Sequence, residues 1–385
     1  MKKKENRKKI MLVCGTRPEA IKLAPLFLSL QNYSDSIQTF FCVTGQHKEM
    51  LFQVLSIFNI KPDYDLKVMR ENQSFFELTS NILIKMKKIL KKVKPDLVIV
   101  HGDTISTFAV SLASFYLKIK VAHVEAGLRT HNIYSPYPEE LNRQLVSKIA
   151  DFHFAPTALS KKNLISENID SKKILVTGNT VIDSLQNTVN LISSNKILQN
   201  SIEQNFNKIL NFNLASGIYI LITVHRRENF GSGLKEICSA INELSKIYRE
   251  IKFILPVHMN PNIKNEVKRA LGNKKNIYLI KPQNYINFVY LLKQCHIVLT
   301  DSGGIQEEAP SLGKPVLVMR DKTERPEGVI AGTLKVIGSS RDSIVKETSL
   351  LINNKKIYKK MSISKNPYGN GKSSKKIAEF INNLS

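Results

Sequence analysis

The sequence contains no tryptophan, only four cysteines and no long apolar run. The cysteines are too far apart for the spacing of a metal site or a redox motif; they are Cys14, Cys42, Cys238 and Cys295. Three of them lie in apolar runs, and we interpret them as reduced, buried thiols that pack as small hydrophobic groups. A nucleophilic cysteine is the alternative.

No stretch approaches the ~20 consecutive apolar residues that span a bilayer, which excludes a membrane-embedded protein. The N-terminus, Met1–Lys9, is basic, and the apolar stretch after it, Ile10–Cys14, is too short for the central region of a signal peptide. We therefore expect a cytoplasmic protein with no membrane insertion.

Acidic residues are scarce: 32 Asp and Glu face 57 Lys and Arg, which gives a formal net charge of +25. A strongly basic chain suggests a nucleic acid partner. The lysines, however, are scattered over helix-like and loop segments, and the chain has neither zinc-finger spacing nor an aromatic RNA-binding motif. We therefore interpret them as a solvated surface and expect no nucleic acid partner, although the charge can attract a phosphorylated ligand.

Short apolar runs rich in β-branched residues alternate with amphipathic stretches along all 385 residues. Strands that alternate with helical patterns predict parallel βαβ units. The expected strands are Ile10–Cys14, Thr39–Thr44, Leu97–Val100, Lys120–Val124, Phe152–Ala155, Ile174–Thr177, Ile218–Thr223, Lys252–Pro256, Ile277–Ile280, Ile297–Thr300, Val316–Val318 and Leu334–Ile337. The expected helices include Pro18–Gln31, Phe75–Val93, Leu234–Tyr248 and Ile305–Leu312. Twelve strands exceed a single sheet, so we expect two doubly wound α/β domains, with the most linker-like stretch at Asp183–Leu214.

Polar clusters follow the predicted strands in both halves of the chain. Because ligands of open parallel sheets bind at the carboxyl ends of the strands, these clusters predict a ligand cleft between two facing domains. The clusters are Gly15–Glu19, Thr44–His47, His101–Thr104, Glu125–Arg129, His225–Asn229, His258 and Asp301–Gly304.

The cluster Asp301–Gly304 precedes a helical segment with Glu307 and Glu308 in its first turn. Glycines allow close backbone approach, and helix N-termini bind phosphate. A tight turn with a good cap is the alternative. Arg17, His225 and Arg325 add donors that make a diphosphate ligand plausible. Neither a Walker sequence nor a strand followed by G-x-G-x-x-G occurs, so we expect no NTP hydrolysis and no nicotinamide or flavin cofactor.

Carboxylates stand near strand ends in the first half: Asp103, Glu125, Glu139 and Glu140. Such groups are costly to bury unless they are paired or used. Two or three acids around a sugar can serve as general acid and base; the alternative is that they form salt bridges to Arg129 and Arg143. His47, His101 and His258 have no specific spacing, so we predict no metal site.

Together these motifs resemble one family, the non-hydrolysing UDP-N-acetylglucosamine 2-epimerases. The resemblance runs from about Ile10 to the C-terminus. It rests on Cys14–Lys22, His101–Thr104, His123–Thr130, Tyr134–Arg143, Thr177–Thr180, His225–Asn229, the long block Leu299–Thr333 and Asn366–Gly369.

The resemblance implies a GT-B-like fold of two Rossmann-like domains with the substrate in the central cleft. It divides the chain into 1–180, a carboxylate-rich domain on the sugar side; 181–365, a UDP-binding domain; and 366–385, a helix that packs back on the first domain. The implied reaction is cofactor-free: it interconverts UDP-N-acetylglucosamine and UDP-N-acetylmannosamine through 2-acetamidoglucal, for bacterial surface polysaccharides. We also expect a homodimer.

The resemblance assigns roles to individual residues. Asp103, Glu125 and Glu139 are the acid and base candidates, and His225 is counted both with them and with the phosphate ligands. The expected substrate-binding residues are Arg17, Lys22, Gln283, Phe288, Ser302, Gly303, Gly304, Glu308 and Arg325. Phe288 should contact the uracil and Glu308 the ribose. A second UDP-N-acetylglucosamine, acting as an activator, would use Gln46, Arg70 and His258.

Two other enzymes fit part of these observations. A hydrolysing 2-epimerase would release free N-acetylmannosamine and UDP, although the blocks His123–Thr130 and Tyr134–Arg143 favour the non-hydrolysing branch. A GT-B glycosyltransferase would bind a UDP-sugar through its second domain but would need an acceptor site where this chain has clustered carboxylates.

Overall fold

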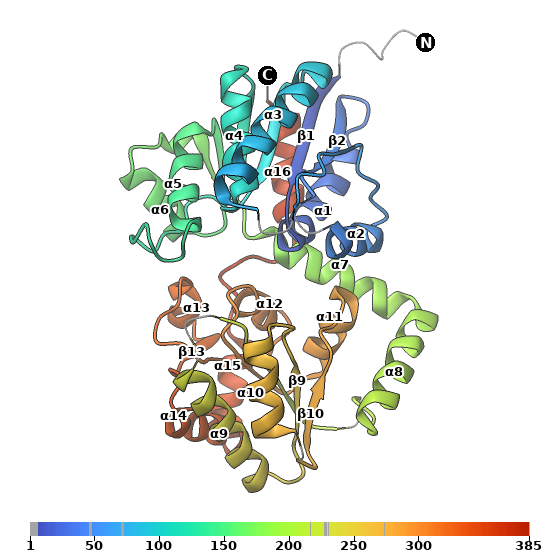
Figure 1. The fold of residues 1–385 in the computed structure, drawn as a ribbon, viewed down its shortest axis with the longest axis vertical. Helices are drawn as coiled ribbons and strands as arrows, with labels where there is room; N and C mark the ends of the chain where they lie inside the picture. The colour runs from blue at the N-terminus through green and yellow to red at the C-terminus, as the bar shows by residue number, and fades with distance from the viewer. Residues whose placement is uncertain are drawn as a thin grey trace. The chain divides into compact units, whose positions relative to one another are not determined.

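The chain folds into two compact units. The computed structural model describes residues 7–45, 48–70, 73–215, 217–226, 229, 231–272 and 274–384. The first unit comprises the chain up to Ser184 together with the segment from Tyr368 onward, and the second comprises Leu185–Pro367. Figure 1 labels the helices and some of the strands.

The first unit is built on a seven-stranded parallel sheet in the order β3-β2-β1-β4-β5-β6-β7. The direction of winding reverses between β1 and β4, and such a switch point is where open α/β sheets bind ligands. Its strands are β1 (Lys8–Cys14), β2 (Ile37–Val43), β3 (Tyr64–Asp65), β4 (Leu97–His101), β5 (Lys120–Val124), β6 (Phe152–Ala155) and β7 (Ile174–Val176).

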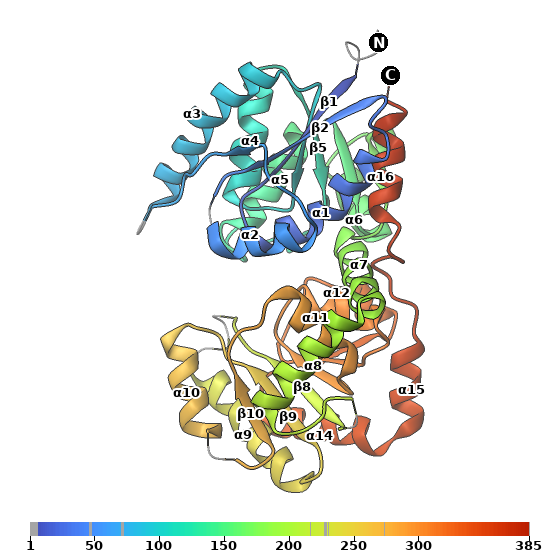
Figure 2. The ribbon, with the colours of Figure 1, turned by 90° about the vertical axis from the view of Figure 1, so that its right-hand side faces the viewer.

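Helices cover both faces of this sheet. Figure 2 shows α3 and α4 on one side and α1 with α16 on the other. The helices are α1 (Arg17–Gln31), α2 (Lys48–Ile57), α3 (Phe75–Val93), α4 (Ile105–Tyr116), α5 (Glu139–Ile149), α6 (Ala158–Ser166), α16 (Ser373–Asn382) and the 3₁₀ turn η1 (Ser171–Lys173), and α7 (Thr180–Ser194) begins in this unit.

Helix α3 has the bounds that its sequence predicts. Ser74 and Glu77 form a capping box that satisfies the first free N–H groups of the helix. Its apolar stripe is buried against β1 and β4 and consists of Leu78, Ile82, Met86, Leu90 and Val93. Burying each such side chain contributes about 1.5–3 kcal/mol, so the stripe holds the helix on the sheet.

The second unit repeats this plan with six parallel strands in the order β10-β9-β8-β11-β12-β13. The strands are β8 (Tyr219–Thr223), β9 (Lys252–Pro256), β10 (Ile277–Ile280), β11 (Ile297–Thr300), β12 (Val316–Val318) and β13 (Leu334–Val336). The helices are α8 (Lys196–Leu210), α9 (Ser232–Ile247), α10 (Pro261–Leu271), α11 (Tyr285–Gln294), α12 (Ile305–Ser311), α13 (Pro326–Ile330), α14 (Arg341–Asn353) and α15 (Lys355–Ile363). The predicted fold class, two doubly wound Rossmann-like α/β domains, is confirmed.

The boundary between the two units, Ser184 to Leu185, falls in the stretch Asp183–Leu214 that the sequence marks as most linker-like. Most of this stretch is the two helices α7 and α8. In α8, Ile202, Phe206 and Leu210 are buried at helical spacing. In α7, the polar residues Asp183, Ser184 and Thr188 are buried as well.

All four cysteines are free and buried, which confirms their reading as packed thiols. Burial raises the pKa of Cys238 and of Cys295 to about 12, so these thiols stay protonated at neutral pH. Within the described ranges, every helix falls short of the length or the apolar character that a bilayer span requires.

Candidate active site

The loops at the carboxyl edge of the first sheet bring several of the predicted residues together. Arg17 begins α1 directly after β1, Asp103 follows β4, and Glu125 follows β5. These three strands are adjacent in the sheet, so their loops lie side by side at the switch point.

Glu125 is held in a buried polar cluster. Its Oε2 atom pairs with the Lys22 ammonium from α1 and accepts a hydrogen bond of 2.7 Å from Asn179 Nδ2. The ring of His101 lies 3.7 Å from the same oxygen. Burial lowers the pKa of His101 to about 4, so Lys22 is the charged partner at neutral pH. The backbone of Glu125 has φ +64, a strained conformation that costs roughly 1–3 kcal/mol and is typical of functional sites.

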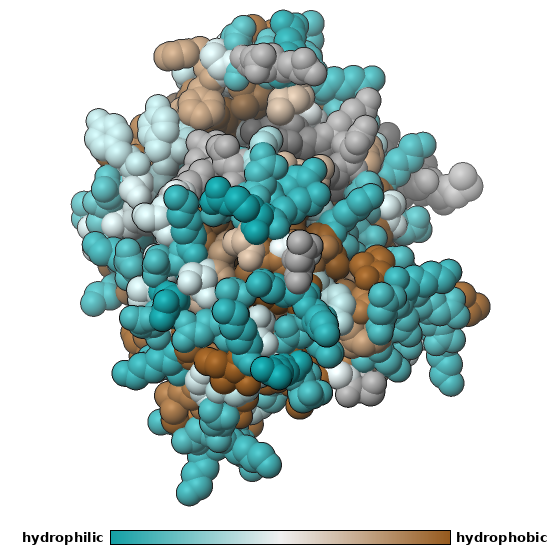
Figure 3. All heavy atoms as spheres, turned by 60° about the horizontal axis from the view of Figure 1, so that its bottom comes forward, coloured by the Kyte–Doolittle hydropathy of each residue, from teal (hydrophilic) through white to brown (hydrophobic). Residues whose placement is uncertain are grey.

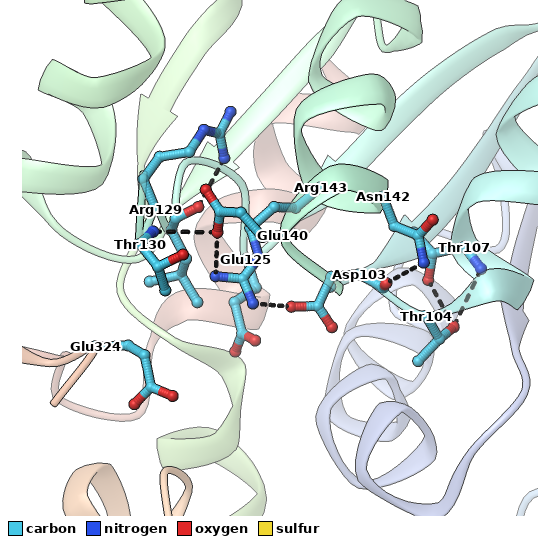
Figure 4. A network of polar contacts seen from close by, with 12 residues as sticks. Asp103, Thr104, Thr107, Glu125, Arg129, Thr130, Glu140, Asn142, Arg143 and Glu324 are labelled. Carbon is cyan, nitrogen blue, oxygen red and sulfur yellow. Dashed lines mark hydrogen bonds and ion pairs between the residues drawn. The ribbon is translucent and has the colours of Figure 1, made fainter. Parts of the chain in front are cut away.

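Asp103 and Glu140 share the guanidinium of Arg143 (Figure 4). Asp103 pairs with Nη2 of Arg143, and Glu140 lies 3.3 Å from Nη1. The alternative of salt bridges to Arg143 is therefore correct for both carboxylates. Arg129, however, pairs with Glu167 and not with Asp103 or Glu125.

The two remaining predicted residues of the first unit are less enclosed. Glu139 is half-buried at the first position of α5, and no other described residue forms a hydrogen bond or ion pair with its carboxylate. Arg17 is half-buried at the N-terminus of α1.

Glu19 is a buried junction that the site prediction missed. One of its oxygens accepts hydrogen bonds from the N–H groups of Gly15 and Thr16, each at 2.7 Å. The other accepts from the hydroxyls of Thr104 at 2.6 Å and Thr107 at 2.9 Å. Burial raises its pKa although these hydrogen bonds oppose the rise. Glu19 therefore ties the loop that carries Arg17 to the loop that carries Asp103.

In the second unit, Asp301 organises the loop after β8. It is fully buried at the end of β11, and its carboxylate lies 3.1 Å from His225 Nδ1. It also accepts hydrogen bonds from the N–H groups of His225 and Arg226. Burial opposes the charged form, but His225 and these N–H donors outweigh it and lower the pKa of Asp301. A carboxylate on Nδ1 fixes the ring orientation and directs Nε2 outward.

The glycine turn 302–304 is packed beneath arginines. A Cβ on Gly303 would lie 3.0 Å from Nη1 of Arg325. The Arg325 guanidinium donates to Glu307 at 2.6 Å and lies 3.7 Å from Glu324. Burial acts against the charge of Glu324, but Arg320, Arg325 and Arg226 hold its pKa at about 2. The network therefore fixes a cationic group over the turn that the sequence assigns to phosphate.

The remaining substrate-binding candidates of this unit lie on or near α11 and α12. Glu308 accepts a hydrogen bond of 3.1 Å from the Tyr285 hydroxyl. Phe288 is half-buried on α11. Gln283 precedes α11, and its amide donates to the Lys281 carbonyl at 2.7 Å.

The residues expected at a second ligand site are only partly described. Gln46 lies outside the described residues, and Arg70 is exposed in the first unit. In the second unit, His258 stacks on His225 with ring centroids 6.2 Å apart. Burial lowers the pKa of His258, and His225 adds to this effect.

Among the described residues no group of three or more His, Cys, Asp or Glu side chains could hold a metal ion. Burial lowers the pKa of His123 to about 3 and that of His153 to about 4, which keeps both rings neutral. His123 instead contacts the Gly102 carbonyl at 2.7 Å.

The residues to which the sequence assigned no individual role in the site are the partners of those it found. They are Glu19, Arg143, Asn179, Asp301, Arg320 and Glu324, and each lies in one of the motifs or clusters named above. Asp301 belongs to a noted cluster because it follows an apolar strand just as Asp103 does. Most of the groups that these residues contact come from separate segments of the chain, so the sequence gave no signal for those contacts.

Comparison with known proteins shows which family this chain resembles. A sequence model described as UDP-N-acetylglucosamine 2-epimerase matches residues 30–382. A UDP-N-acetylglucosamine 2-epimerase of Neisseria meningitidis serogroup A is 52% identical over 373 residues, 97% of this chain and 99% of the relative. One of Escherichia coli K12 is 48% identical over 375 residues, 97% and 98% of the two chains.

Solved structures are similar over the same length. The crystal structure of the Neisseria meningitidis enzyme bound to UDP-GlcNAc superposes with a TM-score of 0.91 at 52% identity, and it covers 97% of this chain and 99% of that one. The structure of a Methanocaldococcus jannaschii UDP-GlcNAc 2-epimerase in complex with UDP-GlcNAc and UDP gives a TM-score of 0.82 at 35% identity, with the same coverage.

Proposed function

The chain belongs to the UDP-N-acetylglucosamine 2-epimerase family, and from this premise we propose that it interconverts UDP-N-acetylglucosamine and UDP-N-acetylmannosamine without hydrolysis. The observation that carries the proposal is the pair of strand-end carboxylates, Asp103 and Glu125, each held by a cation at the switch point of the first sheet. In the proposal, the product supplies bacterial surface polysaccharide synthesis.

The proposed chemistry follows from the substrate. The hydrogen on carbon 2 of the sugar is not acidic, because that carbon carries no carbonyl group. Departure of UDP breaks the anomeric C–O bond and gives carbon 1 oxocarbenium character, which makes the neighbouring C–H bond acidic. A base then takes this proton, and its electron pair forms the C1–C2 double bond of 2-acetamidoglucal. Protonation of carbon 2 on the opposite face and return of a UDP oxygen to carbon 1 give the epimer.

The first unit supplies the acid and base candidates in this proposal. Asp103, Glu125 and Glu139 would surround the sugar ring and move the proton. The ion pairs with Arg143 and Lys22 hold the carboxylates of Asp103 and Glu125 in place. Lys22 and Arg17 would also stabilise the negative charge that develops on the leaving UDP.

The second unit would hold the nucleotide. We assign the phosphates to His225 and the turn Ser302–Gly304, with Arg325 as a cation fixed by Glu307. Phe288 would contact the uracil, Gln283 its edge, and Glu308 the ribose hydroxyls. The contact of Asp301 with Nδ1 supports this role, since it fixes the ring of His225 and leaves Nε2 directed outward.

Proton NMR of UDP-N-acetylglucosamine with the protein in D2O tests the proposal. The expected result is UDP-N-acetylmannosamine with deuterium at carbon 2 in both epimers. Free N-acetylmannosamine and UDP would instead identify a hydrolysing enzyme. Unchanged substrate would overturn the epimerase assignment and leave the glycosyltransferase as the reading to test.

Two further features belong to the proposal. A second UDP-N-acetylglucosamine beside the substrate would activate the enzyme through Gln46, Arg70 and His258. A rate that rises more steeply than a hyperbola as the substrate concentration increases would reveal this activation.

A second copy of the chain would cover the exposed apolar side chains of α3 and α4, among them Phe76, which is 88% exposed, and Tyr116, which is 68% exposed. A sedimentation mass of one chain, 43.6 kDa, would contradict the dimer.

A further inference from the structure

Two sequence motifs have no role in the proposed chemistry, and the first unit brings parts of both together. They are Thr177–Thr180, which follows β7, and Asn366–Gly369, near the C-terminus. The N–H of Asn179 donates to the Tyr368 carbonyl at 2.7 Å. Asn179 is 2% exposed and Tyr368 is 1% exposed, so this contact between residues far apart in sequence is buried.

The side chain of Asn179 has its two ends fixed in different directions. Its Oδ1 atom accepts the N–H of Val181 at 3.0 Å, in the first turn of α7. An amide that accepts there presents its NH2 group on the other side, and Nδ2 donates to Glu125 Oε2 at 2.7 Å. The helix start therefore determines which way the amide faces and delivers a donor to the carboxylate.

The backbone beside Asn179 is pressed against the returning chain. Gly178 has φ +93, and a Cβ at this position would lie 2.6 Å from Ser373 Oγ and 3.2 Å from the Tyr368 carbonyl oxygen. Only glycine allows both this conformation and this approach. Four residues beyond Asn179, the Asp183 carboxylate accepts the N–H of Ser374 at 2.7 Å. The returning segment 368–374 is thus fastened on both sides of Asn179.

We propose that Asn179 is a positioning residue for Glu125 and that the returning segment 368–374 holds Asn179 in place. The inference rests on the proposed role of Glu125 in proton transfer. Lys22 and Asn179 both act on Oε2, so together they set the rotation of the carboxylate, which Lys22 alone, with its flexible stem, does not fix. The C-terminal segment contributes to the reaction through this chain of contacts without touching the substrate.

The variant Asn179→Asp separates this role from a structural one. Aspartate is as good a helix cap as asparagine, so Oδ1 still accepts from Val181 and α7 keeps its first turn. What changes is the group that faces Glu125: a donor becomes a second carboxylate. Besides this group, the titratable side chains of Lys22 and His101 also lie against Glu125.

We expect Asn179→Asp to lower kcat by about 10–100-fold, because a misplaced reacting group loses rate steeply, while KM changes by no more than a few-fold. The acid limb of the kcat–pH profile should move to higher pH, since an added negative charge favours the protonated form of Glu125. The matched control is Asn195→Asp. Asn195 caps α8 in the same way, with Oδ1 3.0 Å from the Leu198 N–H, and this variant should match the wild type.

Two further measurements decide the outcome. In a Glu125→Gln background, Asn179→Asp should cause little additional loss, because both changes act on one group. Gly178→Ala pushes the returning segment away from an intact Asn179. This variant should lower kcat without changing the oligomeric state of the folded protein. Wild-type kcat in Asn179→Asp, or fully additive losses in the double variant, would overturn the positioning role alone. Absence of epimerisation by the wild type would overturn the proposed function, and this role with it.

Discussion

The buried carboxylates of the first unit differ in what satisfies their oxygen atoms. Glu140 accepts hydrogen bonds from the N–H groups of Thr130 and His131 and from the Gln144 amide. Its role is to hold the loop before α5. Glu140 also lies beside the Arg143 guanidinium. Asp103 and Glu125 are each paired with a cation at a strand end, and their chemistry is tested separately.

The first prediction is that binding and chemistry separate in the variants Asp103→Asn, Glu125→Gln and Glu139→Gln. Each should keep its affinity for UDP within several-fold, because the proposal assigns UDP mainly to the second unit. Each should lose ~10²-fold or more in rate, the usual scale for one general acid or base. Calorimetric titration with UDP and epimerisation followed by NMR check the two quantities.

The matched control is Glu140→Gln. This change replaces a fully buried carboxylate that accepts several hydrogen bonds, and it should lower the free energy of unfolding by about 1–3 kcal/mol. Its activity per folded molecule should remain. The three candidate variants could instead behave like this control, with activity reduced only because less of the protein is folded. Asp103, Glu125 and Glu139 would then have no role in the mechanism.

The second prediction concerns the two glycines of the phosphate turn. Gly303→Ala should lower the free energy of unfolding by about 1–3 kcal/mol, because the new methyl group meets Arg325, which Glu307 holds in place. Gly304→Ala should change it by less than about 0.5 kcal/mol, since Gly304 has helical φ and ψ and its Cβ would lie 3.9 Å from the nearest atom. Denaturant unfolding measures both, and equal values would contradict the packing argument.

Single residues could be predicted from sequence where a local rule applied. Asp103 and Glu125 were found because burying a carboxylate at the end of an apolar strand is costly unless the carboxylate is paired or used in function. Their partners could not be found in this way. Lys22 meets Glu125 only because α1 packs beside the sheet, against β1 and β4, and no local pattern contains a contact across 103 residues.

At the scale of elements, strand positions were the most predictable feature. Six of the expected strands, among them Lys120–Val124 and Lys252–Pro256, have the observed bounds, because buried parallel strands are continuous apolar runs. The strand β3 (Tyr64–Asp65) was missed. It has two residues and both are half-buried, so it has no apolar run to detect.

The third prediction concerns the start of α16. Asp183 accepts the N–H groups of Ser373 and Ser374, so Asp183→Ala should lower the free energy of unfolding by about 0.5–2 kcal/mol, as other lost helix caps do. Asp183→Asn keeps an acceptor and should cost much less. Thermal unfolding compares the two variants at neutral pH.

The pH dependence gives this prediction a sign. Burial raises the pKa of Asp183, so the folded state binds the proton more tightly than the unfolded state does. Stability from this group therefore falls as pH rises from the unfolded pKa, about 3.9, through the raised folded pKa. Asp183→Asn should remove this decline, and an unchanged slope would contradict the assignment.

At the scale of the whole molecule, part of the excess of basic residues lies at helix carboxyl ends. In parallel α/β units each crossover helix runs opposite to the strands, so helix carboxyl ends gather at the amino edge of the sheet. Basic side chains are stabilised there by the helix dipole, as Lys91 and Lys92 are at the end of α3 and Lys268 and Arg269 at the end of α10. The face in Figure 3 is largely hydrophilic, with hydrophobic residues in separate smaller areas.

The fourth prediction is that acid destabilises the protein through Glu324. Three arginines hold its pKa at about 2, below the unfolded value of about 4.3. The stabilisation is therefore present above about pH 4.3 and is lost as pH falls toward 2. Glu324→Gln should lower stability at pH 7 and flatten the acid limb of a plot of unfolding free energy against pH. A parallel displacement of the whole curve would contradict this reading.

The last prediction is that activity needs neither a metal nor a nicotinamide. The elimination moves one proton and one UDP group and leaves the oxidation state of the substrate unchanged over a full turnover, so it consumes no hydride. Cations for the departing UDP are available in the chain itself, with Lys22 and Arg17 in the first unit and Arg325 in the second. Activity should therefore survive EDTA treatment and dialysis without added NAD.

The informative control is the variant Arg17→Ala, which should lose rate by orders of magnitude. A charge-assisted hydrogen bond to a buried diphosphate is worth roughly 1.5–3 kcal/mol, and its loss leaves the negative charge of the diphosphate without this donor. If EDTA abolished turnover and one divalent metal restored it, the neutralising charge would come from a metal, and the role assigned to these side chains would be wrong.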